Sequence, residues 1–258
     1  MATRSPILVG YYTMVRKDFM RIIRIWSQTL LPPAITMALY FAIFGTFIGS
    51  QVDAIDGFPY IQFIVPGLVM MSVITSSYMN TVSTFYFAKW LKTIHEILVS
   101  PMPSWTVVAG YVSGGVLRAF LVGVIVITVS LFFTHLTLYS IWIIFAAAFL
   151  TALLFSLLGL INAIFAKSFD AINIVPTFVL TPLTYLGGIF YSIDQLPEFF
   201  RIVSLFNPIL YMVNAFRYGF LGISDVPLSL AFGVMGGLTL VAFIVTLYLF
   251  HKGAGIKS

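Results

Sequence analysis

Few side chains in this sequence of 258 residues have the types and spacing that enzyme chemistry requires. His95 and Glu96 begin a zinc-peptidase HExxH pattern, but Val99 occupies the position of the second histidine, so the pattern is incomplete. The sequence has no GxxxxGKS/T phosphate loop and no GxSxG nucleophile elbow. Its lack of cysteine excludes disulfides, thiolate metal ligands and cysteine nucleophiles. We therefore expect no enzymatic activity, no metal site and no cofactor bound by this chain.

One charged side chain, Arg118, stands inside an apolar stretch that is long enough to cross a membrane. A charge within a span is costly and usually faces the interior, pairs with another group or extends to the lipid headgroups. Arg118 therefore either reaches the phosphates of the inner leaflet or anchors an anionic lipid or lipid-linked substrate. Together with the polar residues Ser76, Asn80 and Asn162, it forms our candidate substrate pathway. Helix packing is the alternative explanation for the hydroxyl and amide groups.

The composition indicates which elements must position these side chains. Hydrophobic residues make up 60% of the sequence and charged residues only 8%, whereas about a quarter of the residues in soluble domains are charged. The sequence thus predicts an all-α integral membrane protein, long enough for about six transmembrane helices of roughly 20 residues. We expect a single membrane domain over residues 1–258, with spans at about 30–49, 59–87, 107–133, 141–166, 172–191 and 228–250.

Residues 11–26 precede the first span and have apolar side chains at helical spacing. The cations Arg16, Lys17 and Arg24 fall largely on the opposite face, with Arg21 near the boundary. This pattern predicts an amphipathic interface helix lying on an anionic leaflet; a solvated cap on the first span is the alternative. The first twenty residues lack the continuous apolar core of a signal peptide, so we expect the N-terminus to be retained.

Lysine and arginine are distributed unevenly between the two sides that these spans define. One side has ten of them and the other two, with Arg118 left inside a span. Because cytoplasmic loops are enriched in Lys and Arg, both termini are predicted to be cytoplasmic. The richer side has Arg4, Arg16, Lys17, Arg21, Arg24, Lys89, Lys92, Lys167, Lys252 and Lys257, and the poorer side has Arg201 and Arg217.

Three pairs of glycines match the GxxxG pattern, which permits close approach of helices. We expect these pairs to serve packing within the chain. They are Gly45 and Gly49, Gly110 and Gly114, and Gly233 and Gly237.

The stretch 175–221 begins like a membrane span but is broken by Pro176, Pro182 and the pair Gly187-Gly188. An amphipathic piece with Asp194, Glu198 and Arg201 follows. Irregular backbone at membrane depth is tolerated only where protein or a water-filled cavity satisfies its polar groups. Such a segment is more typical of a transport pathway than of a simple anchor, and charge counting places its amphipathic half outside the cell.

Several stretches, taken together, resemble the membrane subunit of type-2 ATP-binding cassette exporters. They are the interface helix, the loop HEILVSPMPSWTVVAGY, the span end LGLINAIFAKSFD, and PLTYLGGIFYS followed by LP and LFNPILYMVNAFRYGFLG. The resemblance covers nearly the whole chain and is closest to small bacterial inner-membrane permeases that include the nodulation-factor export proteins. The combination in the last third is the specific part.

The resemblance implies a role for three segments. Residues 92–101 would form the coupling helix that contacts an ATPase, and residues 167–170 would form a second, shorter contact. Residues 187–207 would form an extracytoplasmic re-entrant pair of short helices, with a bend at Gly187-Gly188 and a helix over 196–206; a surface helix without a gating role is the alternative. The coupling residues would be Lys92, Glu96, Ile97, Leu98, Pro101, Lys167 and Asp170, and the gate residues Gly187, Gly188, Leu196, Pro197, Phe199, Phe200 and Asn207.

The resemblance further implies a homodimer in the bacterial inner membrane, with two copies of a cytoplasmic ATPase subunit that binds Mg-ATP. The expected function is export of a lipid, a lipid-linked glycan or an amphipathic drug, and the export direction depends on the resemblance alone. The expected partners are this ATPase, a second copy of the chain and membrane lipids, without nucleic acid. An ion-coupled secondary transporter or channel, and a membrane scaffold, are the alternatives; the former usually needs an intramembrane coupling carboxylate, and none falls clearly within a span.

Overall fold

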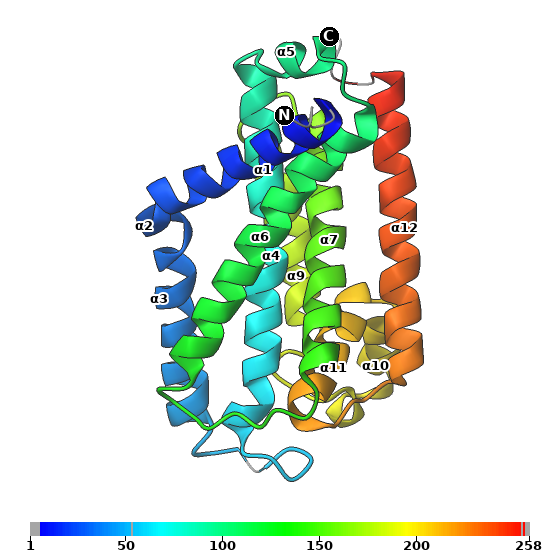
Figure 1. Ribbon diagram of the computed structural model, residues 1–258. Coiled ribbons are helices and arrows are strands. Elements are labelled where there is room, and N and C mark those ends of the chain that lie inside the picture. Colours follow the sequence, from blue (N-terminus) through cyan, green and yellow to red (C-terminus); the bar gives the residue numbers. More distant parts are fainter. Residues whose placement is uncertain (1–5, 53, 254, 256–258) are drawn as a thin grey trace.

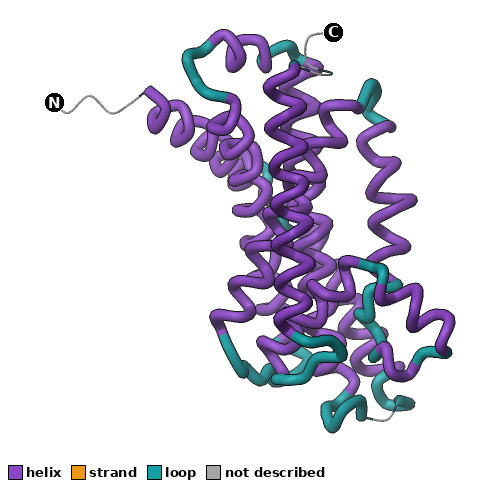
Figure 2. The backbone as a smooth tube through the Cα atoms, turned by 90° about the vertical axis from the view of Figure 1, so that its right-hand side faces the viewer, coloured by secondary structure: helices purple, strands orange, loops and turns teal. Residues whose placement is uncertain are grey.

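The computed structural model describes residues 6–52, 54–253 and 255, and over these residues it is a bundle of helices without a β-strand (Figures 1 and 2). The predicted fold class, an all-α membrane protein, is confirmed. A single isolated β-bridge between Ile55 and Phe58 closes the turn before the second long helix. The peptide groups are therefore bonded mainly within helices, as a lipid environment requires.

Five helical stretches are long and apolar enough to cross a membrane. The first joins α2 (Trp26–Thr29), α3 (Leu31–Tyr40) and the π-helix η1 (Phe41–Ile48). The others are α4 (Tyr60–Trp90), α6 (Ser104–Ser130), α7 (Ile141–Phe165) and α12 (Leu228–Lys252). These five agree with predicted spans one to four and six, with ends shifted by a few residues.

The predicted fifth span, 172–191, is shorter than expected. Its helix joins three five-residue segments, α8 (Ala171–Val175), the π-helix η2 (Pro176–Leu180) and α9 (Thr181–Tyr185). At about 1.5 Å per residue it extends about 22 Å, less than the roughly 30 Å hydrocarbon core. The described chain therefore has five spanning helices, or six when a bent pair of helices further along is counted as one broken span.

The long helix α4 lies at the centre of the bundle, between α6, α7 and α11 (Pro208–Leu221) (Figure 1). In the most apolar 18-residue stretch of α4, 78% of the residues are buried within the chain. The corresponding share is 11% for Trp26–Ile48 and 28% for α12. Figure 1 shows α3 and α12 at opposite edges of the bundle. These two edges present apolar side chains outward, as expected for surfaces that face lipid or another subunit.

The interface helix α1 (Pro6–Arg24) begins five residues before its predicted start and lies obliquely across one end of the bundle (Figure 1). It packs on α6, where a Cβ added at Gly110 would lie 2.8 Å from Met14 and one at Gly114 would collide with the Asp18 carboxylate. Packing within the chain is thus confirmed for this GxxxG pair. Gly45 similarly faces Ile61.

The GxxxG pair on α12 has a different environment. No atom lies within 4 Å of a Cβ added at Gly233 or Gly237. The expectation that this pair packs within the chain is wrong for the described residues. The face of α12 that contains these glycines is open.

Candidate functional site

Most of the described cations lie at one end of the bundle, which we term the basic end and which contains α1, α5 (Ile94–Val99) and the last turn of α12 (Figure 1). Arg201 is the exposed arginine of the opposite end, where it pairs with Asp194 at 3.1 Å. Arg217, which charge counting places on the same side as Arg201, has a buried side chain that is only 1% exposed. Arg4 and Lys257 lie outside the described residues.

Helix α5 projects from the basic end, between α4 and α6 (Figure 1). Ile94 is fully buried and holds the helix against the core, while Ile97 is half-buried. Val99 is 87% exposed, which is the highest value among the large hydrophobic side chains of the described residues. The backbone reaches α5 through Lys92, which has a φ of 60°, a conformation that a side chain with a Cβ adopts at some cost.

The predicted coupling residues mostly lie on this exposed surface. Lys92, Glu96 and Pro101 are exposed and Leu98 lies within α5, although its side chain is outside the described part of the structure. The second predicted contact, the turn 167–170, leads from α7 into α8, and Lys167 and Asp170 are exposed there.

Both predicted contact segments are attached to the last turns of α4. The Lys89 ammonium donates hydrogen bonds to the carbonyl oxygens of Ile164 at 2.8 Å and Ala166 at 2.9 Å, which lie at the end of α7. The rings of Phe87 and Phe169 lie 5.9 Å apart. These contacts join the turn 167–170 to the end of α4, which continues through residues 91–93 into α5.

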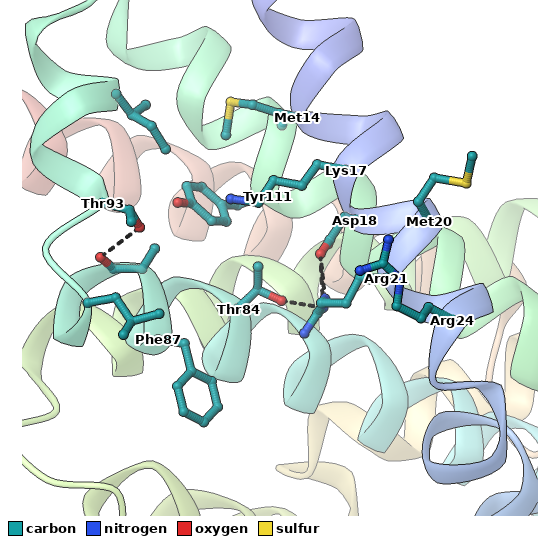
Figure 3. A pocket seen from close by; sticks show the side chains of 14 residues that line it. Met14, Lys17, Asp18, Met20, Arg21, Arg24, Thr84, Phe87, Thr93 and Tyr111 are labelled. Atoms are coloured by element: carbon teal, nitrogen blue, oxygen red, sulfur yellow. Dashed lines mark hydrogen bonds and ion pairs between the residues drawn. The ribbon is translucent and has the colours of Figure 1, made fainter.

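A polar network joins α1 to α4 near the basic end (Figure 3). The Asp18 carboxylate, 6% exposed, pairs with the Arg21 guanidinium at 2.9 Å and accepts a hydrogen bond from the Asn80 amide at 3.1 Å. Arg21 also donates to the side-chain oxygens of Asn80 and Thr84. Asn80 therefore has its polar partners within the bundle.

Two cavities flank this network. The first, which we term the interfacial cavity, has a volume of about 590 Å³ and lies beside α1 (Figure 3). Lys17, Arg21 and Arg24 line it, together with Phe87 and Tyr111. It is thus a basic cavity with aromatic walls.

The second cavity, which we term the Arg118 groove, has a volume of about 580 Å³ and runs between α2–α3 and α4. Of the four predicted pathway residues, the structure places Ser76 and Arg118 along this groove. Asn162 lies elsewhere, where its amide donates to the carbonyl oxygen of Ile172 at 3.3 Å. Other lining residues are Arg21, Ile25, Gln28, Thr29, Pro32, Pro33, Thr36, Met37, Tyr40, Met71, Ser72, Thr75, Met79, Ser83 and Phe87.

The segment after α9 changes direction at Gly188 and again between α10 and α11. Gly188 has a φ of 70° and forms the predicted bend. The 3₁₀-helix η3 (Ile193–Gln195) and α10 (Glu198–Leu205) follow, and α10 meets α11 at an angle of 87°. The helix predicted over 196–206 therefore starts later, with Leu196 and Pro197 in the connection before it.

The predicted gate residues occupy distinct positions in this element. Gly187 lies in a tight site, where an added Cβ would be 2.8 Å from Ile209. Phe199 and Phe200 are exposed on α10. Asn207 caps α11 by accepting a hydrogen bond from the amide of Ile209 at 3.0 Å and donates to the carbonyl oxygen of Leu183.

Residues 10–221 match the protein-family model described as ABC-2 type transporter. The chain belongs to this family. It is 54% identical over 248 residues to the inner membrane transport permease YadH of Escherichia coli K12, covering 94% of each chain. It is 26% identical over 219 residues to nodulation protein J of Rhizobium leguminosarum bv. viciae, covering 83% of each chain. The predicted resemblance is confirmed, and it makes the chain a transport permease of the ABC-2 family.

One prominent side chain of this ABC-2 permease, Arg217 on α11, was missing from the candidate site. Its guanidinium donates to the carbonyl oxygen of Gly188, lies 3.8 Å from an Asp225 carboxylate oxygen and stacks 3.8 Å above the centre of the Phe63 ring. The Asp225 carboxylate accepts hydrogen bonds from the Ser192 hydroxyl at 2.8 Å and from a backbone amide. The sequence signal is an arginine within an apolar helical run, which charge counting places only on the side that is poor in Lys and Arg.

Tyr191 lies between the bend at Gly188 and the 3₁₀-helix η3. Burial raises the pKa of its hydroxyl above the ordinary value of 10.0. The side chain is therefore neutral at physiological pH.

Proposed function

We propose that this ABC-2 permease is the membrane half of an exporter that moves a lipid, a lipid-linked glycan or an amphipathic drug with energy from a separate ATPase. The exposed helix α5 carries this proposal. The relatives support it, since YadH is named an inner membrane transport permease and nodulation protein J a nodulation protein. We accordingly assign the chain to the bacterial inner membrane.

The surface of α5 has the composition of a docking site. Trp90, Leu91 and Val99 expose apolar side chains at the basic end, beside the charged Lys92 and Glu96. Interfaces combine apolar anchors with a polar rim in this way. The ATPase binds here and at the turn 167–170, and it binds Mg-ATP in its own active site.

Movement of the ATPase reaches the spans through α4. The end of this helix is joined to α5 by chain continuity and to the α7–α8 turn through Lys89. Because α4 is the most buried span, its displacement changes the packing of α6, α7 and α11. Nucleotide shifts the conformational equilibrium only through different affinities for the two conformations.

The permease acts as a homodimer with two ATPase subunits. The apolar faces of α3–η1 and α12 are little covered within the chain, which leaves surface for a second copy. The re-entrant element from Gly187 to Asn207 closes the exit side of the pathway. The basic end faces the cytoplasm, with both termini, because described lysines and arginines concentrate there.

An ion-coupled secondary transporter is disfavoured by the positions of the buried carboxylates. The five long spanning stretches that the structure describes contain no Asp or Glu. Asp18 is paired with Arg21, and Asp225 lies beside Arg217. A proton- or sodium-coupling site usually requires a carboxylate that can exchange its partner.

The test is co-purification of the permease with the cytoplasmic ATPase encoded beside it. Wild type should retain the ATPase, and a Val99→Asp variant should retain at least fivefold less, because a charge then replaces an apolar anchor. Val52→Asp, at an exposed valine of the opposite end, is the matched control and should retain the ATPase fully. Equal retention by Val99→Asp and wild type, or transport by the permease alone on an ion gradient, would overturn the proposal.

Orientation is tested separately by single cysteines, since the native chain has none. A cysteine at Asp194 should react with an impermeant thiol reagent added outside cells, and one at Lys92 should react only after permeabilisation. Asp53 is a further external position, although it lies outside the described residues. The opposite labelling pattern would reverse the assigned orientation.

A further inference from the structure

The Arg118 groove contains a cation whose charge the protein does not neutralise. The Arg118 guanidinium donates one hydrogen bond, from Nη2 to the carbonyl oxygen of Thr29 at 3.2 Å. Its Nε is buried without a hydrogen-bond partner. No carboxylate forms an ion pair with it in the part of the chain that the structure describes. A partly buried cation in a membrane protein is costly unless an anion pairs with it.

The neighbouring cation on the same groove is already neutralised. Arg21 is bonded to the Asp18 carboxylate at 2.9 Å. That carboxylate also accepts a hydrogen bond from the Asn80 amide, and it packs closely against Gly114 of α6. Asp18 is thus fully engaged, and the groove retains the single positive charge of Arg118.

Extension of Arg118 toward lipid phosphates at the surface does not fit this geometry. A side chain that extends to the interface would have its guanidinium hydrated. The Nε atom of Arg118 is instead buried, and its Nη2 is bonded to a backbone carbonyl at the α2 end of the groove. The guanidinium is therefore held inside the groove.

Two of the hydroxyls on the remaining wall of the groove are already engaged within α4. The hydroxyls of Ser72 and Thr75 donate to carbonyl oxygens one turn back on α4, at 3.1 and 2.9 Å. Met37, Met71 and Met79 add flexible apolar surface, which adapts to chains of irregular shape. An occupant thus meets a cation with free N–H groups beside Thr29 and a largely apolar wall elsewhere.

The length of the groove suits an amphiphile. From Met71 to Phe87, both of which line it, α4 rises about 24 Å at about 1.5 Å per residue. Half of the hydrocarbon core is about 15 Å. The interfacial cavity shares Arg21 and Phe87 with the groove, so the two are adjacent near α1.

From these observations we infer that the Arg118 groove binds an anionic amphiphile, with its phosphate or carboxylate headgroup on Arg118 and an acyl or similar apolar chain along the α4 wall. Since this inference rests on the proposed export function, it names the substrate class of that exporter. Lys17 and Arg24 of the interfacial cavity attract the same headgroup from the leaflet before it reaches Arg118.

Binding is measured by native mass spectrometry of the purified permease, without ATPase, titrated with phosphatidylglycerol, with phosphatidylcholine of the same chains, and with inorganic phosphate. Wild type should retain phosphatidylglycerol at least tenfold more tightly than phosphatidylcholine, and inorganic phosphate should bind far more weakly than either. Arg118→Gln should reduce phosphatidylglycerol affinity about tenfold. Arg118→Lys should be intermediate, because it retains the charge and loses the planar fork.

The matched control is Arg16→Gln, which removes one exposed positive charge from α1 at a position that lines neither cavity. It should bind phosphatidylglycerol like wild type. Equal affinity of wild type for the two lipids, unchanged binding by Arg118→Gln, or binding of inorganic phosphate as tight as that of the lipid would each overturn the inference. If Arg118→Gln fails to fold, the lipid selectivity of wild type and the affinity of Arg118→Lys decide the outcome.

The two proposals fail in different assays. The groove is tested on the permease alone, and the ATPase partnership by retention of the ATPase on Val99→Asp. Loss of lipid selectivity with intact ATPase binding would remove the substrate class and leave the exporter. Lipid binding at Arg118 without ATPase binding would remove the exporter and leave a lipid site.

Discussion

Two arginines of membrane-embedded helices, Arg118 on α6 and Arg217 on α11, differ in almost every respect. Arg217 is 1% exposed, lies over the Phe63 ring and beside the Asp225 carboxylate, and bonds the carbonyl oxygen of Gly188. Arg118 is partly buried along a groove, bonds one carbonyl oxygen and has no carboxylate partner among the described residues. Arg217 thus has a carboxylate that balances its charge, although its Nε and Nη1 atoms make no hydrogen bond, whereas Arg118 has no such carboxylate among the described residues.

We propose that this difference separates a structural role for Arg217 from a binding role for Arg118. Arg217 joins α11 to the bend at Gly188 and to the connection before α12, and so fixes the re-entrant element in place. Arg118 makes one hydrogen bond, to a backbone carbonyl oxygen, and its charge is available to the ligand that we propose. Both residues are arginines, so the residue type does not distinguish the two roles. The presence of a carboxylate beside the guanidinium does.

The largest expected effect is on stability, at Arg217. Arg217→Met leaves the Asp225 carboxylate buried beside an apolar side chain, and breaking a buried pair in this way costs about 3–5 kcal/mol of unfolding free energy. Unfolding in mixed detergent micelles measures it. Arg201→Gln, which breaks the exposed pair with Asp194, is the control and should cost less than about 1 kcal/mol. Equal losses in the two variants would show that Arg217 does not hold the element.

The next effect concerns the attachment of α1. Gly114→Val places a side chain where the Asp18 carboxylate lies, so α1 must move and its network with Arg21 must open. Overpacking of this kind costs about 1–3 kcal/mol, which thermal unfolding in detergent detects. Gly237→Val has open space around it and should change stability by less than about 0.5 kcal/mol. A stable Gly114→Val variant would contradict the packing of α1 on α6.

A smaller loss is expected when one member of the α1–α4 network is removed. Asn80→Ala leaves an oxygen of the buried Asp18 carboxylate without its amide donor, at a cost of about 1–2 kcal/mol. Asn173→Ala, whose amide bonds only an exposed carbonyl, serves as the control. If Asn80→Ala were as stable as wild type but bound lipid differently, Asn80 would belong to the pathway rather than to the network.

The smallest effect on stability is expected at Arg118. Arg118→Gln loses one hydrogen bond but also removes an uncompensated charge, so the unfolding free energy should change by less than about 1 kcal/mol. The same unfolding assay measures it. A loss as large as that of Arg217→Met would assign Arg118 a structural role and remove the distinction between the two arginines.

The sequence predicted the spans and the interface helix because hydropathy and helical periodicity are local properties. It could not predict the partners of Asn80, since Asp18 lies 62 residues earlier on a different helix. For the same reason it could not predict the contacts of Arg217, because the carbonyl oxygen that Arg217 bonds belongs to Gly188, 29 residues away. Charge counting gives only the side on which an arginine lies, whereas the contacts with Phe63 and Asp225 show that this one is buried.

The end of the predicted fifth span illustrates a second limit. Gly187 and Gly188 marked a break in the apolar run, but the run itself continues to Tyr191 and gave no reason to stop at Tyr185. The helix ends there because the chain turns to bring Gly187 against Ile209 of α11. Of the predicted pathway, Arg118 and Ser76 share a groove, while Asn162 joins α7 to α8. These positions depend on which helices meet, which a single sequence does not specify.

The distinction between the two arginines is tested most directly by ligand-induced stabilisation. A ligand that binds only the folded protein raises its stability, by about 2.7 kcal/mol at a concentration of 100 times Kd. Phosphatidylglycerol, compared with phosphatidylcholine, should raise the thermal unfolding midpoint of wild type and of Arg201→Gln by the same amount. It should raise that of Arg118→Gln by only about half as much, because a tenfold weaker affinity lowers the gain at this concentration to about 1.4 kcal/mol. An equal rise in all three proteins would contradict the account, because the anionic lipid would then be bound without Arg118.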